Sequence, residues 1–263
     1  MSDHGQPPLL EVQNLTKRYS AFTAVRDVSF GIRRHQILGV LGPNGAGKST
    51  IVKVITGILE PTDGSVLYRG KRIGDDLIGY KRAVGYVPEQ PDLYGYLTGW
   101  EYLDMVATLR GLDRKLFREK ASTMLEGFTL YSSRDIAISS YSKGMRQRIV
   151  VISALLHNPE ILILDEPFSG LDVTSALVLR RVIGLLAERG KAVFFSSPVL
   201  EQADKLCTHL VVLKRGAVAA AGEIDQIHRT FAGLDLETGF MELTGQGDVE
   251  TDAERIAGAV AAS

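Results

Sequence analysis

The sequence contains a single cysteine, Cys207, and therefore lacks the thiols for an intrachain disulfide framework. It also lacks an apolar run of the roughly 18 residues needed to span a bilayer. Its N-terminus, MSDHGQPPLL, has no basic segment followed by an apolar one, so we expect no secretory signal. Charge of one sign is not in surplus, because 30 Lys and Arg residues face 31 Asp and Glu residues. These absences argue against a secreted domain, a membrane-spanning chain and binding to nucleic acid through bulk electrostatics.

What is present is a chain of 263 residues, 45% of them hydrophobic, which can bury a substantial core in one large domain. Apolar strands alternate with amphipathic helices, which favours an α/β fold with a mainly parallel sheet. Residues 9–15 and 25–32 alternate in the manner of half-buried antiparallel strands. The apolar period becomes helical at about residues 91–155, which predicts a helical insertion. Residues 244–263 are rich in Gly and Ala, and we expect a flexible tail there.

The segment GPNGAGKST, residues 42–50, fits the pattern G-x-x-x-x-G-K-[ST] and is called the phosphate loop below. It follows the apolar strand QILGVLG and opens a helix, which is the context this motif requires. Its glycines let backbone N–H groups surround phosphate oxygens, and the helix N-terminus adds partial positive charge. We expect Lys48 to reach the β- and γ-phosphates and Ser49 to offer its hydroxyl to Mg²⁺. The alternative is a glycine-rich strand-to-helix turn that holds no ligand.

The segment ILILDEP, residues 161–167, is an apolar strand that ends in two acids. An Asp at the carboxyl end of a neighbouring strand can hold Mg²⁺, directly or through water, and we expect this of Asp165. Glu166 can then orient or deprotonate the attacking water. The alternative is a strand that simply ends in acids, which is common for one acid and less so for two. Together with the phosphate loop, the segment predicts a P-loop nucleotide hydrolase.

The segment YSKGMRQR, residues 141–148, narrows the class because it precedes a helix and lies between the other two motifs. Here the chain resembles the ATPase subunits of ATP-binding cassette (ABC) transporters, whose signature reads approximately LSGGQ-x-QR. The chain keeps Ser142, Gly144, Gln147 and Arg148 of that signature. SGLD, residues 169–172, resembles the loop that crosses the dimer interface in this family, and LDLETGFMELTG resembles a C-terminal segment of many bacterial exporter-type members.

The resemblance implies one domain over residues 8–243, with a P-loop core, an N-terminal antiparallel β subdomain and the inserted helical subdomain. It implies a head-to-tail dimer with a second ATP-binding subunit, identical or different, that closes around ATP and Mg²⁺. It also implies a transmembrane permease subunit that holds the chain at the cytoplasmic side of the inner membrane. Tyr19 falls where the family places an aromatic ring against adenine, although an ordinary edge-strand tyrosine is the alternative. The residues implied in nucleotide contact are Tyr19, Val25, Gly42, Asn44, Gly45, Ala46, Gly47, Lys48, Ser49, Thr50, Ser142, Lys143, Gly144, Met145 and Asp172.

The sequence departs from the family pattern in GYVPEQPDLY, where the family usually has glutamine directly after the proline, in contact with Mg²⁺. Here that position is Glu89, followed by Gln90. A carboxylate can also serve Mg²⁺, so we expect Glu89 to join Ser49 and Asp165 as a metal ligand, with Gln90 as the alternative.

A second departure lies in SSPVLEQADKLC, where Pro198 stands at the position of a histidine that contacts the γ-phosphate in the family. Proline suits the first turn of a helix, because its missing N–H would be unpaired there anyway and a preceding serine can cap. It can neither donate to a phosphate nor relay a proton. His157 and His209 lie at unsuitable places in the sequence to replace the histidine. We therefore expect Lys48 and Glu166 to support only slow hydrolysis.

The leading hypothesis is the ATP-binding and ATP-hydrolysing subunit of an exporter-like bacterial ABC transporter. One alternative is a regulatory or degenerate subunit that binds ATP with little hydrolysis and pairs with an active ATPase subunit. Another is a soluble ABC ATPase acting on ribosomes or DNA, although those usually carry two cassettes or long coiled-coil insertions. We expect no nucleic-acid partner, because no aromatic residues are interleaved with Lys143, Arg146 and Arg148. The transported substrate is not encoded, because its site would lie in the membrane partner.

Overall fold

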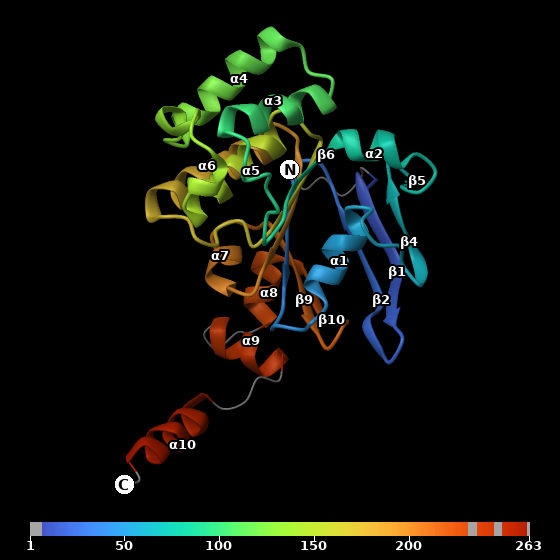
Figure 1. Cartoon of the computed structure of the whole chain (residues 1–263). Coiled ribbons are helices and arrows are strands. Elements are labelled where there is room, and N and C mark those ends of the chain that lie inside the picture. The colour runs from blue at the N-terminus through green and yellow to red at the C-terminus, as the bar shows by residue number, and fades with distance from the viewer. Residues whose placement is uncertain (1–6, 231–235, 245–248, 262–263) are drawn as a thin grey trace.

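The computed structural model of the chain describes residues 7–230, 236–244 and 249–261. Two sheets lie side by side, with helices covering the outer face of the larger one (Figure 1). The smaller sheet has the order β2-β1-β4-β5 and the larger sheet the order β10-β9-β3-β8-β7-β6. The strands are β1 Leu10–Tyr19, β2 Phe22–Ile32, β3 Ile37–Leu41, β4 Asp63–Tyr68, β5 Lys71–Arg72, β6 Val84–Val87, β7 Ile161–Asp165, β8 Ala192–Ser197, β9 His209–Lys214 and β10 Ala217–Glu223.

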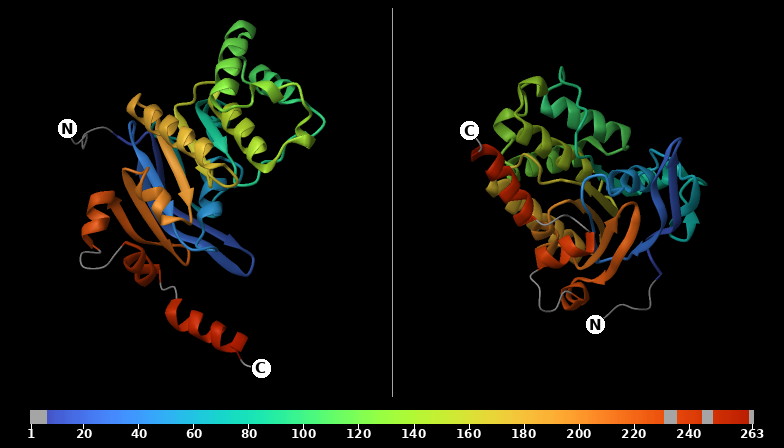
Figure 2. Two further views of the ribbon diagram at one scale, coloured as in Figure 1. Left: turned by 90° about the vertical axis from the view of Figure 1, so that its left-hand side faces the viewer. Right: turned by 90° about the horizontal axis from the view of Figure 1, so that it is seen from below.

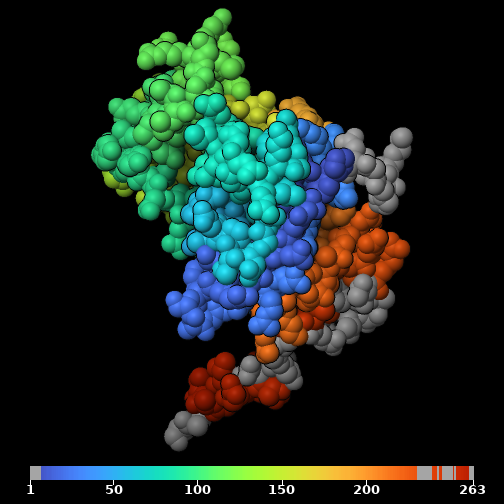
Figure 3. All heavy atoms as spheres, turned by 90° about the vertical axis from the view of Figure 1, so that its right-hand side faces the viewer, coloured from blue at the N-terminus to red at the C-terminus, as the bar shows by residue number. Residues whose placement is uncertain are grey.

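The larger sheet is parallel except at one edge. Strands β9, β3, β8, β7 and β6 run parallel, and β10 pairs antiparallel with β9. Every residue of β3, β7 and β8 is buried, as expected for parallel strands that are covered on both faces. The smaller sheet is antiparallel throughout and covers one face of the molecule (Figure 3). The mainly parallel core and the N-terminal antiparallel subdomain predicted from the sequence are both confirmed.

Helices cover the larger sheet and extend beyond it (Figure 2). Helices α3, α4 and α5 form the helical insertion at the top of Figure 1. None of the helices in the described part of the chain is long and apolar enough to cross a membrane. The helices are α1 Lys48–Ile55, α2 Leu77–Ala83, α3 Gly99–Leu109, α4 Arg114–Gly127, α5 Lys143–Leu155, α6 Val173–Glu188, α7 Leu200–Asp204, α8 Ile224–Thr230, α9 Leu236–Thr244 and α10 Val249–Ala261, with short 3-10 turns at Tyr131–Ser133 and Ile138–Ser140.

Several helices begin at residues whose side chains cap the first turn. Thr98 and Glu101 form a reciprocal capping box at the start of α3, with hydrogen bonds of 3.1 and 2.8 Å. Asp113, Ser142 and Asp172 accept backbone N–H groups at the starts of α4, α5 and α6. These caps explain why the helices begin at these residues.

The core is divided by the parallel sheet. Alternate residues of β3 face opposite sides, so that Ile37 and Leu41 pack with the helical insertion while Leu38 and Val40 pack with α1 and the smaller sheet. Cys207 is buried within the first of these clusters. The sheet therefore holds both subdomains, and its carboxyl-terminal edge is shared between them.

The structure places a helix in the segment that the sequence analysis expects to be a flexible tail. Helix α10, Val249–Ala261, lies apart from the body of the chain in Figure 1, in the left view of Figure 2 and in Figure 3. The segment is rich in alanine, which has the highest helix propensity of the amino acids. A composition rich in Gly and Ala is therefore compatible with a helix here. Part of the predicted C-terminal segment LDLETGFMELTG lies in α9, and its residues 234, 235 and 245 lie outside the described residues.

Candidate functional site

The phosphate loop connects the end of β3 to the start of α1. Gly47 has φ +105°, a left-handed conformation that disfavours other residues, and a Cβ there would lie 2.8 Å from the Ala24 carbonyl oxygen. A Cβ on Gly42 would lie 2.7 Å from the Leu213 carbonyl oxygen. The glycines therefore let the loop turn sharply while it packs against β2 and β9. The first backbone N–H groups of a helix have no partner within it, so those at the start of α1 are the groups that the motif offers to phosphate oxygens.

Lys48 is the first residue of α1 and is 7% exposed. Its Nζ donates to the carbonyl oxygens of Gly42 and Pro43, at 2.6 and 3.2 Å. Burial lowers the pKa of Lys48, although the nearby charges of Glu166, Asp165 and Glu89 oppose that shift. The structure thus brings one cation and three acids together at the edge of the parallel sheet.

Asp165 ends β7 and is 5% exposed. Burial raises its pKa from 3.8 to about 6; Glu89 and Glu166 add to that rise, while Ser196 and Lys48 oppose it. A carboxyl group with a raised pKa and several charged neighbours is typical of a functional site.

Glu166 follows Asp165 with φ +47°, an uncommon conformation for a residue with a side chain. Its backbone N–H donates to the Ser196 carbonyl oxygen at 3.0 Å, which holds the turn. Burial, with a contribution from Glu89, raises the pKa of the Glu166 carboxyl group. Strained backbone of this kind is concentrated at functional sites in proteins.

The structure distinguishes between Glu89 and Gln90, the two candidates for the metal ligand that follows Pro88. Glu89 is half-buried and acts electrostatically on Lys48, Asp165 and Glu166. Gln90 is exposed and takes part in no hydrogen bond among the described residues. Glu89 is therefore the residue of this pair that lies with the acids.

No three His, Cys, Asp or Glu side chains among the described residues come close enough to hold a metal ion by themselves. That result fits Mg²⁺ sites of P-loop proteins, where one or two protein oxygens and the phosphates of the nucleotide share the ion. Ser49 is exposed at the loop, next to Lys48, and Asp165 lies across from Lys48. Hydroxyl and carboxylate oxygens are suitable donors for such an ion.

Tyr19 ends β1 at the turn of the β1–β2 hairpin, and Val25 lies in β2 beside Gly47 of the phosphate loop. Val25 is fully buried, and a Cβ on Gly47 would lie 3.0 Å from its side chain. The Tyr19 ring stacks on Phe22, with ring centroids 5.5 Å apart, and is 36% exposed. Phe22, which is 63% exposed, is not among the residues predicted from the sequence, although an aromatic residue on each side of the two-residue turn was a signal for it.

The signature residues form a second group that contacts the segment after Glu166. Ser142 caps α5 by accepting the Met145 N–H at 3.2 Å, and Lys143 Nζ donates to Ser169 Oγ at 3.0 Å. Gly144 passes so close to Gly170 that a Cβ would lie 2.6 Å from the Gly170 carbonyl oxygen. No hydrogen bond joins the signature residues to the phosphate loop in the described chain. The other residues of the phosphate loop that are predicted to contact the nucleotide are Asn44, Gly45, Ala46 and Thr50.

Asp172 begins α6 and accepts hydrogen bonds from the Ser175 N–H and hydroxyl, both at 2.8 Å. These hydrogen bonds lower the pKa of the Asp172 carboxyl group. Within the single chain, Asp172 is therefore a helix cap whose charge is stabilised by the first turn of α6.

Pro198 does not occupy the first turn of a helix, contrary to the expectation from the sequence. Helix α7 begins at Leu200 with Val199 as its N-cap, and Ser197 Oγ accepts the Val199 N–H at 3.0 Å. Pro198 instead joins the end of β8 to that cap, because proline favours extended backbone in the residue before it. It is partly exposed at the same edge of the sheet as the acids.

Neither histidine considered as a substitute lies at this edge. His157 Nε2 contacts the Val84 carbonyl oxygen at 3.0 Å, at the start of β6, and burial lowers its pKa to about 4. His209 is the first residue of β9 and contacts Gln36, just before β3. Since the acids follow the carboxyl ends of the parallel strands, both histidines lie at the opposite edge of the sheet.

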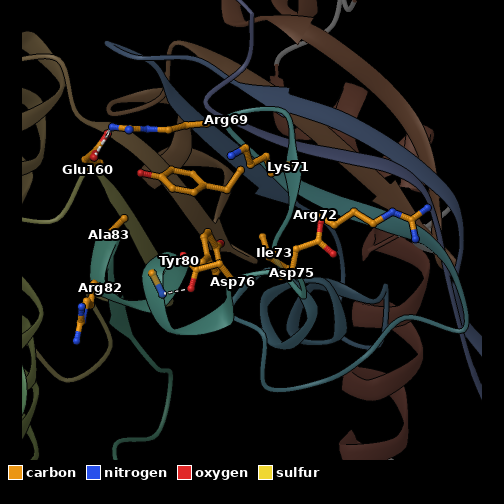
Figure 4. Close-up of a pocket in the computed structure, with 12 residues that line it drawn as sticks. Arg69, Lys71, Arg72, Ile73, Asp75, Asp76, Tyr80, Arg82, Ala83 and Glu160 are labelled. Atoms are coloured by element: carbon orange, nitrogen blue, oxygen red, sulfur yellow. Dashed lines mark hydrogen bonds and ion pairs between the residues drawn. The ribbon is translucent and has the colours of Figure 1, made fainter.

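A pocket of about 470 Å³ lies elsewhere, between β4, β5 and α2 (Figure 4). Glu160 closes one side through its ion pair with Arg69, at 2.6 Å. In all, four cationic side chains and three acids line the pocket, and none of the residues predicted for nucleotide contact lines it. It is therefore not the site that the motifs define.

The comparisons with known proteins agree with this arrangement. Residues 25–169 match the family model described as ABC transporter. The uncharacterized ABC transporter ATP-binding protein YxlF of Bacillus subtilis (strain 168) is 37% identical over 221 residues, covering 83% of this chain and 72% of that protein. The ABC-type transporter ATP-binding protein EcsA of the same organism is 33% identical over 238 residues, covering 90% of this chain and 96% of that protein.

A solved structure described as the ATP binding subunit of an ABC transporter has the same fold, with a TM-score of 0.85 and 35% identity. The match covers 90% of this chain and 99% of that one. The phosphate loop and the acids at the carboxyl edge of the sheet lie inside the matched region. The chain therefore belongs to the ABC transporter family, among the ATP-binding subunits whose cassette domain binds ATP.

Proposed function

We propose that this chain binds and hydrolyses Mg-ATP as one half of a dimer that drives a transmembrane permease. The observation that carries the proposal is the convergence of Lys48, Asp165 and Glu166 at the carboxyl edge of the parallel sheet, next to a glycine loop that opens α1. A glycine-rich turn without a ligand would have no need for acids with raised pKa values beside a buried lysine. This is the arrangement that phosphoryl transfer requires.

In this proposal, the phosphate loop binds the triphosphate through the backbone N–H groups at the start of α1. Lys48 exchanges its contacts with Gly42 and Pro43 for the β- and γ-phosphates. Ser49, Asp165 and Glu89 would hold Mg²⁺, which would neutralise charge on the phosphates. Glu166 orients the attacking water and accepts its proton, which a raised pKa favours. Tyr19 provides an aromatic face for the base.

A dimer is part of the proposal because one chain leaves the signature apart from its own phosphate loop. Ser142, Lys143 and Gly144 contact the segment after Glu166, as described above. A second subunit placed head to tail would bring its own α5 N-terminus to the γ-phosphate, where helix N-termini favour anions. A solved bacterial ABC transporter cassette described as dimeric shares the fold, at a TM-score of 0.76 and 24% identity.

Pro198 sets the expected rate of the reaction. It lies at the edge that carries the acids, where it offers no donor to the γ-phosphate. Slow hydrolysis is therefore the expected property of a site built from two copies of this chain. The second candidate function, a subunit that acts mainly through ATP binding beside an active partner, rests on the same residue. Docking to the permease at the cytoplasmic face of the inner membrane completes the proposal and follows from the family.

The test is phosphate release from Mg-ATP by the purified chain, by Pro198→His and by Glu166→Gln, with ATP affinity measured for each. We expect Pro198→His to raise turnover by roughly one or two orders of magnitude, the range for one positioned catalytic group. Glu166→Gln should abolish turnover while ATP still binds. Brisk hydrolysis by the unaltered chain, stopped only by Glu166→Gln, would show that Pro198 does not limit the reaction.

A further inference from the structure

One buried hydroxyl group at the edge of the parallel sheet has no hydrogen-bond partner. Ser196, the next-to-last residue of β8, is 0% exposed and lies directly beside Asp165 in the parallel register of β7 and β8. Within the described residues, its Oγ makes no hydrogen bond of ordinary geometry. The other such atoms belong to His157 and Arg180, neither of which lies among the acids.

An unpaired buried hydroxyl is costly, at about 1–3 kcal/mol, so its presence needs an explanation. The next residue shows the contrast. Ser197 is also buried, but its hydroxyl accepts the Val199 N–H and lies 3.0 Å from Gln202 Oε1. The preceding residues of β8, Phe194 and Phe195, are fully buried and apolar. Alanine at position 196 would satisfy the packing of β8 without leaving a polar atom unpaired.

Residues paired across adjacent strands present their side chains on the same face of a sheet, so the Ser196 hydroxyl lies beside the Asp165 carboxylate. The geometry between the two groups falls short of an ordinary hydrogen bond. The Ser196 carbonyl oxygen at the same time accepts the Glu166 N–H at 3.0 Å. Residue 196 therefore adjoins both acids, one through its side chain and the other through its backbone.

We propose that Ser196 is a positioning residue: its hydroxyl donates to the Asp165 carboxylate when Asp165 helps to hold Mg-ATP, and so fixes which carboxylate oxygen faces the metal ion. The proposal rests on the assignment of Asp165 to Mg²⁺ in the proposed function. Partners that orient a metal-binding carboxylate commonly change metal affinity by about 10–100-fold when removed. The Ser196 hydroxyl, which has no other partner among the described residues, is available for this role.

The experiment compares Ser196→Ala with Ser196→Thr, which keeps the hydroxyl. A fluorescent ATP analogue is titrated in Mg²⁺ and in EDTA, and the ratio of the two affinities gives the metal-dependent part of binding. We expect Ser196→Ala to reduce that ratio about 10-fold or more, with affinity in EDTA unchanged. Ser196→Thr should retain the ratio. Urea unfolding should show that Ser196→Ala is no less stable than the unaltered chain, because it removes an unpaired polar group.

Two further variants serve as controls, one for the loss of a buried hydroxyl elsewhere and one for the metal-binding role of Asp165. Ser153→Ala removes another buried hydroxyl, which donates to the Val150 carbonyl oxygen within α5, and should leave the ratio unchanged. Asp165→Asn should reduce the ratio by itself. If Asp165→Asn reduces it and Ser196→Ala does not, the role of Ser196 is refuted while the metal site stands. If neither variant changes it, the assignment of Asp165 to the metal is refuted together with this proposal. Equal loss of affinity in Mg²⁺ and EDTA, with lower stability, would show that Ser196 is only structural.

Discussion

Replacing Asp165 with Asn should stabilise the metal-free, nucleotide-free chain. The folded protein raises the pKa of Asp165 from 3.8 to about 6, chiefly through burial at the end of β7. Above pH 6 the folded chain therefore carries a charge that its surroundings disfavour. The difference between the two pKa values corresponds to about 3 kcal/mol of free energy of unfolding. Asn removes the charge and keeps nearly the same shape.

The stability gained by Asp165→Asn should increase as the pH rises. Because the pKa of folded Asp165 lies above that of the unfolded chain, the folded state binds more protons between about pH 4 and pH 6. The contribution of Asp165 to stability is therefore greatest below pH 4 and is lost as the pH rises through 6. We expect Asp165→Asn to gain up to about 3 kcal/mol at pH 7 relative to the unaltered chain, and almost nothing at pH 4.

The assay is urea unfolding in EDTA from pH 4 to pH 8, read as the difference between variant and unaltered chain. The difference is needed because burial lowers the pKa of His157 from 6.5 to about 4, which destabilises the fold as the pH falls through the same window. His157 is common to both proteins and cancels. Asp75→Asn, at an exposed acid, is the control and should show no such change. A difference that does not vary with pH, or that falls as the pH rises, would refute the reasoning.

Three further substitutions have equally specific expectations. Gly47→Ala should abolish binding of a fluorescent ATP analogue, because the added methyl group meets a backbone carbonyl 2.8 Å away at φ +105°; retained affinity would contradict this. Gln147→Leu should lower the free energy of unfolding by about 1–3 kcal/mol, since the 2% exposed Gln147 donates to the Pro167 carbonyl oxygen at 3.1 Å; thermal denaturation measures the loss. Phe22→Ala should weaken ATP by about 1 kcal/mol and leave inorganic triphosphate unaffected, because Phe22 supports the Tyr19 ring; competition titrations with both ligands distinguish a base contact from a phosphate contact.

The strands and helices could be predicted where an apolar run of the sequence forms an element that is buried in the fold. The apolar runs at β3, β7 and β8 are buried on both faces, and the caps Asp113, Ser142 and Asp172 mark helix starts directly. Strand β10 was overlooked because AVAAAGE has little β-propensity and forms only as an edge beside β9. Helix α2 was overlooked because it is short and its only fully buried residue is Tyr80.

The candidate site was predictable as a set of motifs and not as a set of contacts. The loop residues and the acids can be read from spacing, but their mutual charges appear only when β3 and β7 are placed in one sheet. The choice between Glu89 and Gln90 depends on which way the chain turns after β6, which no local pattern encodes. Ser196 looked like an ordinary strand residue, because the absence of a hydrogen-bond partner is a property of packing.

The close approach of Gly144 to Gly170 has a mechanical consequence. Together with the contacts from Lys143 to Ser169 and from Gln147 to Pro167, it joins the start of α5 to the segment that follows Glu166. The start of α5 and the segment after Glu166 are thus packed tightly together, and we expect a rotation of the helical insertion to shift the turn that carries Glu166. A partner that contacts the α5 N-terminus should then also change the orientation of the Glu166 carboxylate in the same chain.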